Sequence, residues 1–361
     1  MFTPNIGSVS TKFLISYCGS AENVFKTTKS KLLKIPNIGN SAATSIINKE
    51  GLPLAEIELQ ILEKENGDII FYTDENYPER LKSINDAPAL LFTKGKTNLN
   101  SAKVISIVGT RNSTDYGKDF TETLIKDISK YNDVIIISGL AFGIDIIAHK
   151  AALKYNIPTV GVMGSGLDQI YPSAHKSTAQ QIINENGALL TEYKWKTKID
   201  PNYFPARNRI VAGMCDAVII VEAAIKGGAL ITAEIGNSYN KDVFAVPGNI
   251  GNKYSEGCNH LIKSHKANLL TGIEDLEYIM NWQNDADVKK KSINKEINFD
   301  HLILDEKEKR ILLLLQSKKI LILDDLSWQT QIPVNVIASL LLNLELQGLV
   351  KALPGKKFTL N

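Results

Sequence analysis

Short apolar runs alternate with helical patterns through the middle of the chain. The clearest run, residues 104–108, contains mostly β-branched residues and ends at a glycine, which is typical of a strand buried on both faces of a parallel sheet. Further strands are expected at residues 134–138, 159–163, 188–192, 217–222, 243–246 and 268–270, with helices at residues 143–155, 173–184, 205–214 and 230–239. This alternation predicts an α/β domain over residues 67–282, with a Rossmann-like, mostly parallel sheet and helices on both faces.

Residues 1–66 have a helical pattern without strands. Within them, residues 30–48 predict two helices joined by a turn that contains Pro36 and Gly39. In a helix-hairpin-helix of this kind, within a SAM-like helical domain, backbone N–H groups bind a DNA phosphate without reading sequence. A tight turn in a small packing domain would leave the same pattern, so both interpretations stay open. Residues 68–95 change to short apolar runs with prolines, which predicts an edge strand or two of the following domain.

The last part of the chain follows a polar segment. Residues 283–304 include three consecutive lysines at positions 289–291 and are expected to form a solvated linker. Three helical patterns and a strand pair then predict a winged-helix-like domain over residues 305–361. Its expected recognition helix, residues 334–347, contains no Lys or Arg. Binding of a partner, or packing alone, is therefore at least as consistent with the pattern as binding in a DNA groove.

Composition narrows the class of protein. The 361 residues carry 41 Lys and Arg against 39 Asp and Glu, so a surface that binds nucleic acid has to be a local cluster of cations. Cys18, Cys215 and Cys258 form no C-x-x-C pair, which predicts a reducing compartment and no structural zinc site. The sequence shows neither a signal-peptide pattern nor an apolar run long enough to span a bilayer. The expectation is a soluble cytoplasmic protein without a metal or a membrane partner.

Glycine-rich loops follow four of the predicted strands. Their characteristic residues are Gly109, Thr110 and Arg111 in the first, Ser138, Gly139 and Gly143 in the second, Gly161, Gly164 and Gly166 in the third, and Lys226, Gly227 and Gly228 in the fourth. Glycines let an anion approach the backbone, and helix N-termini favour negative charge, so the four loops together predict a phosphate-binding edge. The chain contains neither a G-x-G-x-x-G motif with a ribose-binding acid nor a G-x-x-x-x-G-K-[ST] motif, so no nucleotide cofactor is expected.

A second basic cluster consists of Arg207, Asn208 and Arg209. It follows Pro205, a residue suited to the first turn of a helix. Cations in a first turn oppose the helix dipole. Their presence there favours a bound anion over a simple salt-bridged helix start, and the cluster becomes a candidate extension of the phosphate-binding edge.

Catalytic motifs are not evident in the sequence. The histidines lie outside the H-E-x-x-H and nucleophile-elbow patterns, and His149 stands among alanines in a predicted helix, which is typical of a packed histidine. Three acids that follow predicted strands or lie in a loop have no partner that the sequence identifies: Glu192, Glu222 and Glu234. Phe142 and Tyr254 are candidates for stacking on nucleic-acid bases, although packing is the simpler explanation for each.

These motifs match, in order, those of the DprA/Smf family of DNA-processing factors in natural transformation. That family has G-[ST]-R, S-G-x-A-x-G-I-D, P-x-R-N-R-I and K-x-G-[SA]-L-I-T-A motifs, followed by Pro-Gly and G-x-N-x-L-I. The corresponding segments here are residues 109–111, 138–145, 205–210, 226–233, 247–248 and 257–262. The chain resembles this family over most of its length, and its terminal domains resemble those of longer members.

The resemblance implies a non-catalytic protein that binds single-stranded DNA, forms a homodimer and loads the RecA recombinase onto incoming strands. It implies that Arg111 contacts a phosphate. With the glycine loops, the expected DNA-binding set is Gly109, Thr110, Arg111, Ser138, Gly139, Gly143, Arg207, Asn208, Arg209, Lys226, Gly227 and Gly228. Arg111, Lys226 and Arg209 are expected in one groove. The implied dimer interface includes His260, Leu261, Ile262 and Leu269.

Two other classes of function stay open. Residues 226–234 faintly resemble the P-G-G-x-G-T-x-x-E loop of nucleotide phosphoribohydrolases, although Leu230, Ile231 and Thr232 replace the central Gly-Thr pair. Release of free base from a nucleoside monophosphate would support that enzyme. The other class is an adaptor whose glycine loops only pack, and failure to bind oligonucleotides at low salt would support it.

Overall fold

The structure, a computed structural model, describes residues 1–282, 304–318, 320–353 and 357–360. The chain divides into two compact units, residues 1–285 and 286–361. The expected linker, residues 283–304 with its lysines at 289–291, lies almost entirely outside the described residues. Within the described ranges, no helix combines the length and the apolar character needed to cross a membrane.

Short helices form the N-terminal part of the first unit. They are α1 (Ser8–Cys18), α2 (Ala21–Lys26), α3 (Lys29–Leu32), α4 (Asn40–Ile47) and α5 (Leu52–Lys64). The helix before the expected hairpin, α3, is a single turn, because Pro36 lies close behind it and cannot continue a helix. Helix α5 joins this part to the sheet, since Leu62 packs in one apolar cluster with Phe92 and Leu189. The backbone N–H of Trp195 also donates to the buried carboxylate of Glu58 at 2.6 Å.

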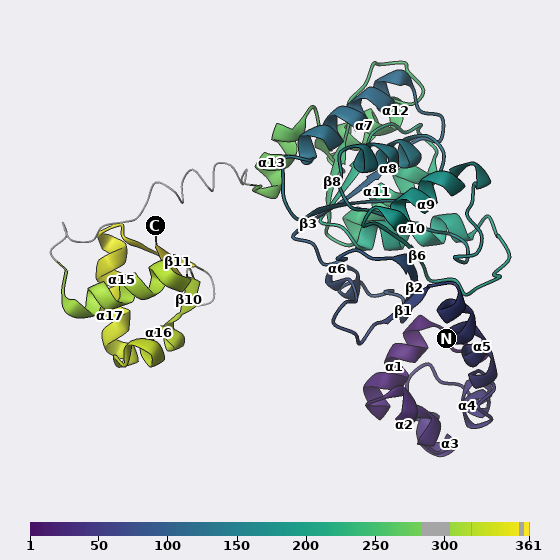
Figure 1. The fold of residues 1–361 in the computed structure, drawn as a ribbon, viewed down its shortest axis with the longest axis horizontal. Coiled ribbons are helices and arrows are strands. Elements are labelled where there is room, and N and C mark those ends of the chain that lie inside the picture. The colour runs from purple at the N-terminus through teal and green to yellow at the C-terminus, as the bar shows by residue number, and fades with distance from the viewer. Residues whose placement is uncertain (283–303, 319, 354–356, 361) are drawn as a thin grey trace. The chain divides into compact units, whose positions relative to one another are not determined.

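A sheet with the strand order β1-β2-β6-β5-β4-β3-β7-β8-β9 forms the centre of the first unit (Figure 1). The strands are β1 (Asp68–Phe71), β2 (Leu90–Gly95), β3 (Lys103–Val108), β4 (Val134–Ser138), β5 (Thr159–Val162), β6 (Ala188–Thr191), β7 (Ala217–Ile220), β8 (Asp242–Ala245) and β9 (Asn268–Leu269). Strands β6 to β9 in this order run parallel, and β2 and β1 add antiparallel pairs at one edge. The predicted Rossmann-like, mostly parallel sheet is confirmed.

The order of the strands reverses beside β3. The chain proceeds from β3 to β4, β5 and β6 on one side, and then returns to β7, β8 and β9 on the other. Ile105 of β3 is therefore in register with Ile136 of β4 and with Ala217 of β7. In open α/β sheets, ligands bind beyond the carboxyl ends of the strands at such a switch point. The loops that follow β3 and β7 meet there.

Helices cover both faces of the sheet (Figure 1). One face is covered by α7 (Asp115–Ile128), α8 (Ile144–Lys154) and α13 (Ile273–Met280), and the other by α10 (Tyr203–Gly213), α11 (Gly228–Ser238) and α12 (Glu256–Lys263). Because successive strand residues point to opposite faces, Val104 and Ile105 belong to different cores. The remaining helices of this unit are α6 (Glu79–Lys82), a 3-10 turn (Ser173–His175) and α9 (Lys176–Asn184).

The second unit is a winged helix, as predicted. It contains α15 (Glu306–Lys318), β10 (Ile320–Ile322), α16 (Leu323–Thr330), α17 (Val334–Leu346), β11 (Val350–Leu353) and β12 (Lys357–Leu360). Its core includes Ile311, Leu315, Ile337 and Leu341. The expected strand pair gains a third member, because β10 pairs antiparallel with β12.

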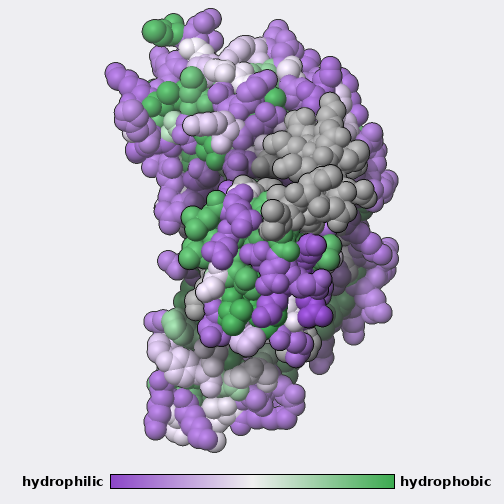
Figure 2. All heavy atoms as spheres, turned by 90° about the vertical axis from the view of Figure 1, so that its left-hand side faces the viewer, coloured by the Kyte–Doolittle hydropathy of each residue, from purple (hydrophilic) through white to green (hydrophobic). Residues whose placement is uncertain are grey.

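Hydrophobic patches interrupt a mainly hydrophilic surface (Figure 2). In the winged helix, Leu342 and Leu346 of α17 are exposed, the latter at 80% of its area. A helix that enters a DNA groove presents cations at such positions. The surface of α17 therefore differs from that of a typical recognition helix.

Candidate nucleic-acid interface

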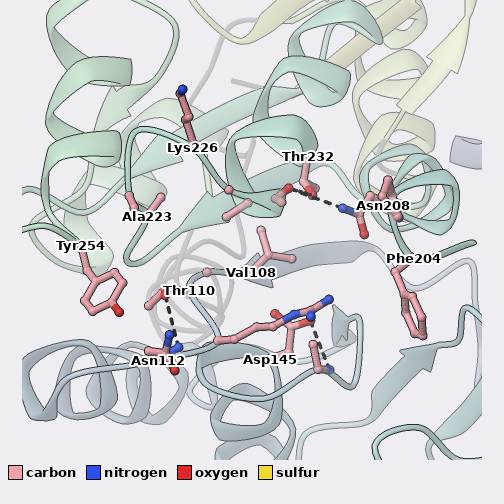
Figure 3. Close-up of a pocket in the computed structure, with 18 of the residues that line it drawn as sticks. Val108, Thr110, Asn112, Asp145, Phe204, Asn208, Ala223, Lys226, Thr232 and Tyr254 are labelled. Carbon is pink, nitrogen blue, oxygen red and sulfur yellow. Dashed lines mark hydrogen bonds between the residues drawn. The ribbon is translucent and has the colours of Figure 1, made fainter. Parts of the chain in front are cut away.

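A pocket of about 350 Å³ lies at the switch point of the sheet (Figure 3). Residues 109–112 after β3 and residues 223–229 after β7 form much of its lining. The start of α10 and the segment around Tyr254 complete it, and Phe204 and Tyr254 lie at opposite ends in the close-up. Ala141 and Asp145 of the second predicted loop also line it, so three of the four predicted loops meet around one cavity.

Three exposed cations stand at this pocket: Arg111, Lys226 and Lys253. None of the ion pairs among the described residues involves any of the three side chains. Lys226 extends away from its neighbours in Figure 3. An exposed cation without a carboxylate partner keeps its charge available for an anion.

The N-terminus of α11 opens beside these cations. Gly227 occupies the N-cap position and Gly228 the first helical position, and both are exposed. A Cβ added at Gly228 would meet only the Asn208 amide nitrogen, 4.0 Å away. The first N–H groups of a helix have no intrahelical acceptor and favour an anion. The fourth loop thus places these donors, with Lys226, at the pocket.

The second loop packs against the backbone of Thr110 and Arg111. Gly143 has a φ of +74°, and a Cβ there would lie 2.1 Å from the Thr110 carbonyl oxygen. The backbone N–H of Ile144 donates to the same oxygen at 3.2 Å. Only glycine permits this approach without strain. Gly143 therefore positions the loop that carries Arg111.

Ser138 and Gly139 lie below the surface. The Ser138 hydroxyl is fully buried and donates to the Ile107 carbonyl at 2.6 Å. The N–H of Gly139 donates to the Asp145 carboxylate at 3.1 Å. Both residues were expected in the DNA-binding set, but their polar groups are engaged within the protein because they end the buried strand β4.

Arg207 is buried beneath the pocket. Its guanidinium donates to the carbonyls of Gly139 and Val162, and a Cβ at Gly139 would lie 2.4 Å from it. Burial lowers the pKa of Arg207 to about 10, so it stays charged at neutral pH. Burial also raises the pKa of Asp145, while the positive charge of Arg207 acts in the opposite direction. These two buried groups join the loops that follow β4 and β5.

Arg209 points away from the pocket. Its guanidinium donates to the Asp86 carbonyl at 2.8 Å and pairs with the Glu192 carboxylate, and its side chain is 17% exposed. The expectation that it shares a groove with Arg111 and Lys226 is not met. Residues two apart on an α-helix are rotated by about 200°, so Arg207 and Arg209 face opposite sides.

The argument from the helix dipole also needs correction. Helix α10 begins at Tyr203, two residues before the expected start at Pro205. Residues 207–209 therefore lie beyond its first turn, where the dipole has little effect. Only Asn208 of this cluster reaches the opposite loop, since its amide donates to the Gly228 carbonyl at 3.4 Å.

The candidate acids all have partners. The buried carboxylate of Glu222 accepts from the N–H of Thr114 at 2.9 Å and from its hydroxyl at 2.6 Å. Glu192 pairs with Arg209, and Glu234 pairs with Lys266 at 2.7 Å. Across the described ranges, no cluster of three or more His, Cys, Asp or Glu side chains is placed to hold a metal ion.

His149 is buried on α8, in agreement with a packing role. Its Nδ1 lies 2.7 Å from the Thr159 hydroxyl oxygen. Burial lowers the pKa of His149 to about 3, and the nearby positive charge of Arg207 acts in the same direction. The imidazole is therefore neutral at physiological pH.

The expected dimer residues do not all reach the surface. Leu261 is buried in the core with Cys258, because α12 turns these two residues toward the sheet. His260 is exposed and Ile262 is partly buried. Leu269, exposed at 46%, lies on β9, the edge strand of the sheet. Leu261 consequently cannot contact a second chain without leaving the core.

The expected DNA-binding set did not include Phe204, Lys253 and Thr232, which also line the pocket. Phe204 stands directly before Pro205 in a motif that was recognised for its arginines. The position of Phe204 next to this motif, and not its residue type, was the feature of the sequence that could have indicated a place at the pocket. Tyr254, considered as a stacking residue, does line the pocket.

Comparison with known proteins identifies the family. The model of DNA recombination-mediator protein A matches residues 68–281, and that of the DprA winged helix domain matches residues 301–356. The DNA processing protein DprA of Streptococcus pneumoniae is 42% identical over 203 residues, which are 56% of this chain and 71% of the relative. Protein Smf of Escherichia coli is 34% identical over 308 residues, which are 83% of this chain and 79% of the relative.

Two solved structures are also similar. DNA processing protein A from Streptococcus pneumoniae has a TM-score of 0.59 at 32% identity, over 75% of this chain and 97% of that chain. The protein of the same name from Helicobacter pylori has a TM-score of 0.54 at 31% identity, over 60% and 97% of the two chains. The latter structure was reported for its single-stranded DNA binding mode. With both of its units matched in this way, the chain belongs to the DNA recombination-mediator protein A family, the DprA/Smf family.

Proposed function

We propose that this protein is a recombination mediator that binds single-stranded DNA at the pocket between β3 and β7. The observation that carries the proposal is the meeting of Arg111 and Lys226, both exposed, with the open N-terminus of α11. Each of these groups favours a phosphate. The reported DNA binding mode of the Helicobacter pylori relative supports the same class of ligand.

The proposed contacts read the backbone rather than the bases. Arg111 and Lys226 hold successive phosphates, and the N–H groups at Gly227 and Gly228 donate to the strand between them. Thr110, Gly109 and Asn208 shape the pocket around these contacts. Contacts of this type give strong salt dependence and little sequence preference.

Four residues of the expected DNA-binding set have an indirect role in this proposal, because they position the loops that contact the strand. They are Ser138, Gly139, Gly143 and Arg207. The buried Arg207 joins the ends of β4 and β5 through the carbonyls of Gly139 and Val162. Arg209 supports the opposite face of α10.

We further propose that the protein acts as a homodimer that loads RecA onto incoming strands in natural transformation, without catalysing a reaction. The resemblance of the motifs to the DprA/Smf family supports this assignment. The edge strand β9, with Leu269, and the outer side of α12, with His260 and Ile262, form the proposed dimer surface. The engaged carboxylates of Glu192, Glu222 and Glu234 support a non-catalytic role.

The test is oligonucleotide binding by fluorescence anisotropy across a potassium chloride series, with single strand and duplex compared and the dimer state monitored by light scattering. Arg111→Ala is expected to weaken binding of the single strand about tenfold, the effect of losing one charge-assisted contact. The slope of log affinity against log salt should fall by about 0.7, the value for one phosphate of a single strand.

Arg310→Ala is the matched control, because Arg310 is an exposed arginine of α15 in the winged helix. It should leave the affinity unchanged. Equal affinities of the wild type and a correctly folded Arg111→Ala variant would refute the proposed contact. Incubation with nucleoside monophosphates, followed by chromatography for free base, tests the proposal that the protein is not a phosphoribohydrolase.

A further inference from the structure

Leu140 has an unusual backbone conformation at the start of the loop after β4. Its φ is +56°, in the left-handed region. Among the described residues that have a positive φ and are not glycine, Leu140 alone is apolar, and most of the others are Asn. A left-handed conformation is unfavourable for a residue with a Cβ, and it persists where the surrounding structure holds it. The contacts around Leu140 therefore show what keeps this loop in place.

The N–H groups on either side of Leu140 converge on one side chain. Gly139 and Ala141 both donate to the same carboxylate oxygen of Asp145, at 3.1 and 3.4 Å. Backbone turns that include a left-handed residue form such concavities of N–H groups around an acceptor. Leu140 itself is buried, so its carbonyl oxygen requires a donor from another segment.

His175 supplies that donor. Its Nδ1 lies 2.8 Å from the Leu140 carbonyl oxygen, and its side chain is buried. A carbonyl oxygen can only accept, so Nδ1 carries the hydrogen. The ring also lies 4.8 Å from the ring of Phe142 in the same loop, edge to face. Because His175 ends the 3-10 turn before α9, this bond joins the loop after β4 to the segment after β5.

The loop held in this way forms part of the pocket. Ala141 directly follows Leu140 and lines the pocket. Two residues later, Gly143 packs against the backbone of Thr110 and Arg111. A change in the turn at Leu140 moves both contacts, because they follow within three residues of it.

We propose that His175 is a positioning residue for the pocket at the switch point, through its hydrogen bond to Leu140. This inference rests on the proposed binding of single-stranded DNA at that pocket. His175 itself does not contact the strand. It keeps the loop after β4 in the conformation that places Ala141 at the pocket and Gly143 against the backbone of Arg111. Loss of the bond lowers the fraction of molecules with a competent pocket, and the apparent affinity falls by the same factor.

Two substitutions separate the hydrogen bond from the volume of the ring. His175→Phe keeps a ring against Phe142 but removes the donor. His175→Asn restores a donor, since the Asn amide nitrogen is as many bonds from the backbone as Nδ1. His175→Phe is expected to weaken oligothymidylate binding in anisotropy titrations about fivefold, the effect of one hydrogen bond. His175→Asn should stay within about twofold of the wild type.

The salt series distinguishes positioning from contact with a phosphate. The loss in His175→Phe should be the same at every salt concentration, whereas Arg111→Ala also lowers the salt slope. In a Leu140→Gly background, His175→Phe should weaken binding by less than about twofold, because glycine adopts a positive φ without strain. Ser165→Ala is the matched control. It removes a buried hydroxyl that donates to the Gln169 carbonyl at 2.7 Å in the same segment as His175, and it should leave the affinity unchanged.

Hydrogen exchange, followed by mass spectrometry of the full chain, measures the loop without DNA. In His175→Phe, the amide of Ala141 should exchange faster than in the wild type, because the turn opens more often. In His175→Asn it should exchange at the wild-type rate. If His175→Phe does not fold, His175→Gln takes its place, because the Gln amide nitrogen is one bond further from the backbone than Nδ1.

The outcomes separate this inference from the proposed function. If the wild type binds the strand and a folded His175→Phe variant binds it equally well, His175 does not position the pocket, although the phosphate contacts stand. Equal losses in His175→Asn and His175→Phe would also overturn the inference, since the donor would then not matter. If the wild type does not bind at low salt, the proposed function fails, and the exchange of Ala141 still decides whether His175 holds the loop.

Discussion

Arg207 is expected to stabilise the fold strongly, although its motif points to DNA binding. Its guanidinium is buried and donates to the carbonyls of Gly139 and Val162, which end two neighbouring strand regions. Arg207→Ala removes both donors and leaves the buried carboxylate of Asp145 without the compensating positive charge. Arg111→Ala, in contrast, removes an exposed side chain outside the ion pairs of the described residues.

The magnitude follows from these contacts. A hydrogen bond to a charged group contributes about 1.5–3 kcal/mol, so the two bonds contribute about 3–6 kcal/mol. Removal of one partner from a buried pair of charges lowers stability by about 3–5 kcal/mol. Both values place the loss for Arg207→Ala near about 4 kcal/mol in the free energy of unfolding. An exposed substitution such as Arg111→Ala changes it by less than about 0.5 kcal/mol.

Urea denaturation followed by circular dichroism measures this difference on the full chain. Arg207→Lys should recover little, because an ammonium group cannot reach two carbonyls with a rigid fork. If Arg207→Ala unfolds at the wild-type urea concentration, the guanidinium does not stabilise the fold and this reasoning is wrong.

Two further predictions concern His149 and Arg209. The buried His149 has a folded pKa of about 3, whereas the unfolded chain takes up a proton near pH 6.5, so stability falls as the pH drops from about 6 to 4. His149→Gln should flatten that decline by about 1.4 kcal/mol per pH unit in urea titrations, and an unchanged slope would contradict the burial argument. Arg209→Ala should lower stability by about 1–3 kcal/mol, because the buried Glu192 loses its partner. The affinity of the Arg209→Ala variant for single-stranded DNA in anisotropy titrations should stay within about twofold of the wild type. A loss of affinity as large as that of Arg111→Ala would show that Arg209 does contact the DNA.

Local patterns were sufficient to predict the sheet and its helices. Runs such as residues 104–108 are apolar at every or nearly every position, and this is dictated by burial on both faces. Thr114, a residue type that favours the N-cap position, caps α7 by accepting from the N–H of Gly117. The predicted boundaries of some elements differ from the structure by one or two residues. Helix α10 is an example, because Tyr203 and Phe204 at its start have no strong capping preference.

The facing of side chains was harder to predict. Arg207, Arg209 and Leu261 belong to recognisable motifs, but a motif does not state which side of a helix contacts the sheet. Residues two apart on a helix are rotated by about 200° about its axis, so Arg207 and Arg209 of α10 cannot both face the pocket. Arg207 consequently became a buried support, and Arg209 a partner of Glu192.

The sequence by itself determined the mostly parallel sheet, the winged helix and the glycine-rich loops at the strand ends. These depend on the spacing of apolar residues and on backbone freedom, which are properties of short segments. Only the tertiary structure decided that Arg111 and Lys226 meet at one pocket, with Phe204 and Tyr254 also in its lining. These residues lie far apart in the chain, and their meeting depends on the order of the strands, which returns the chain from β6 to β7 beside β3.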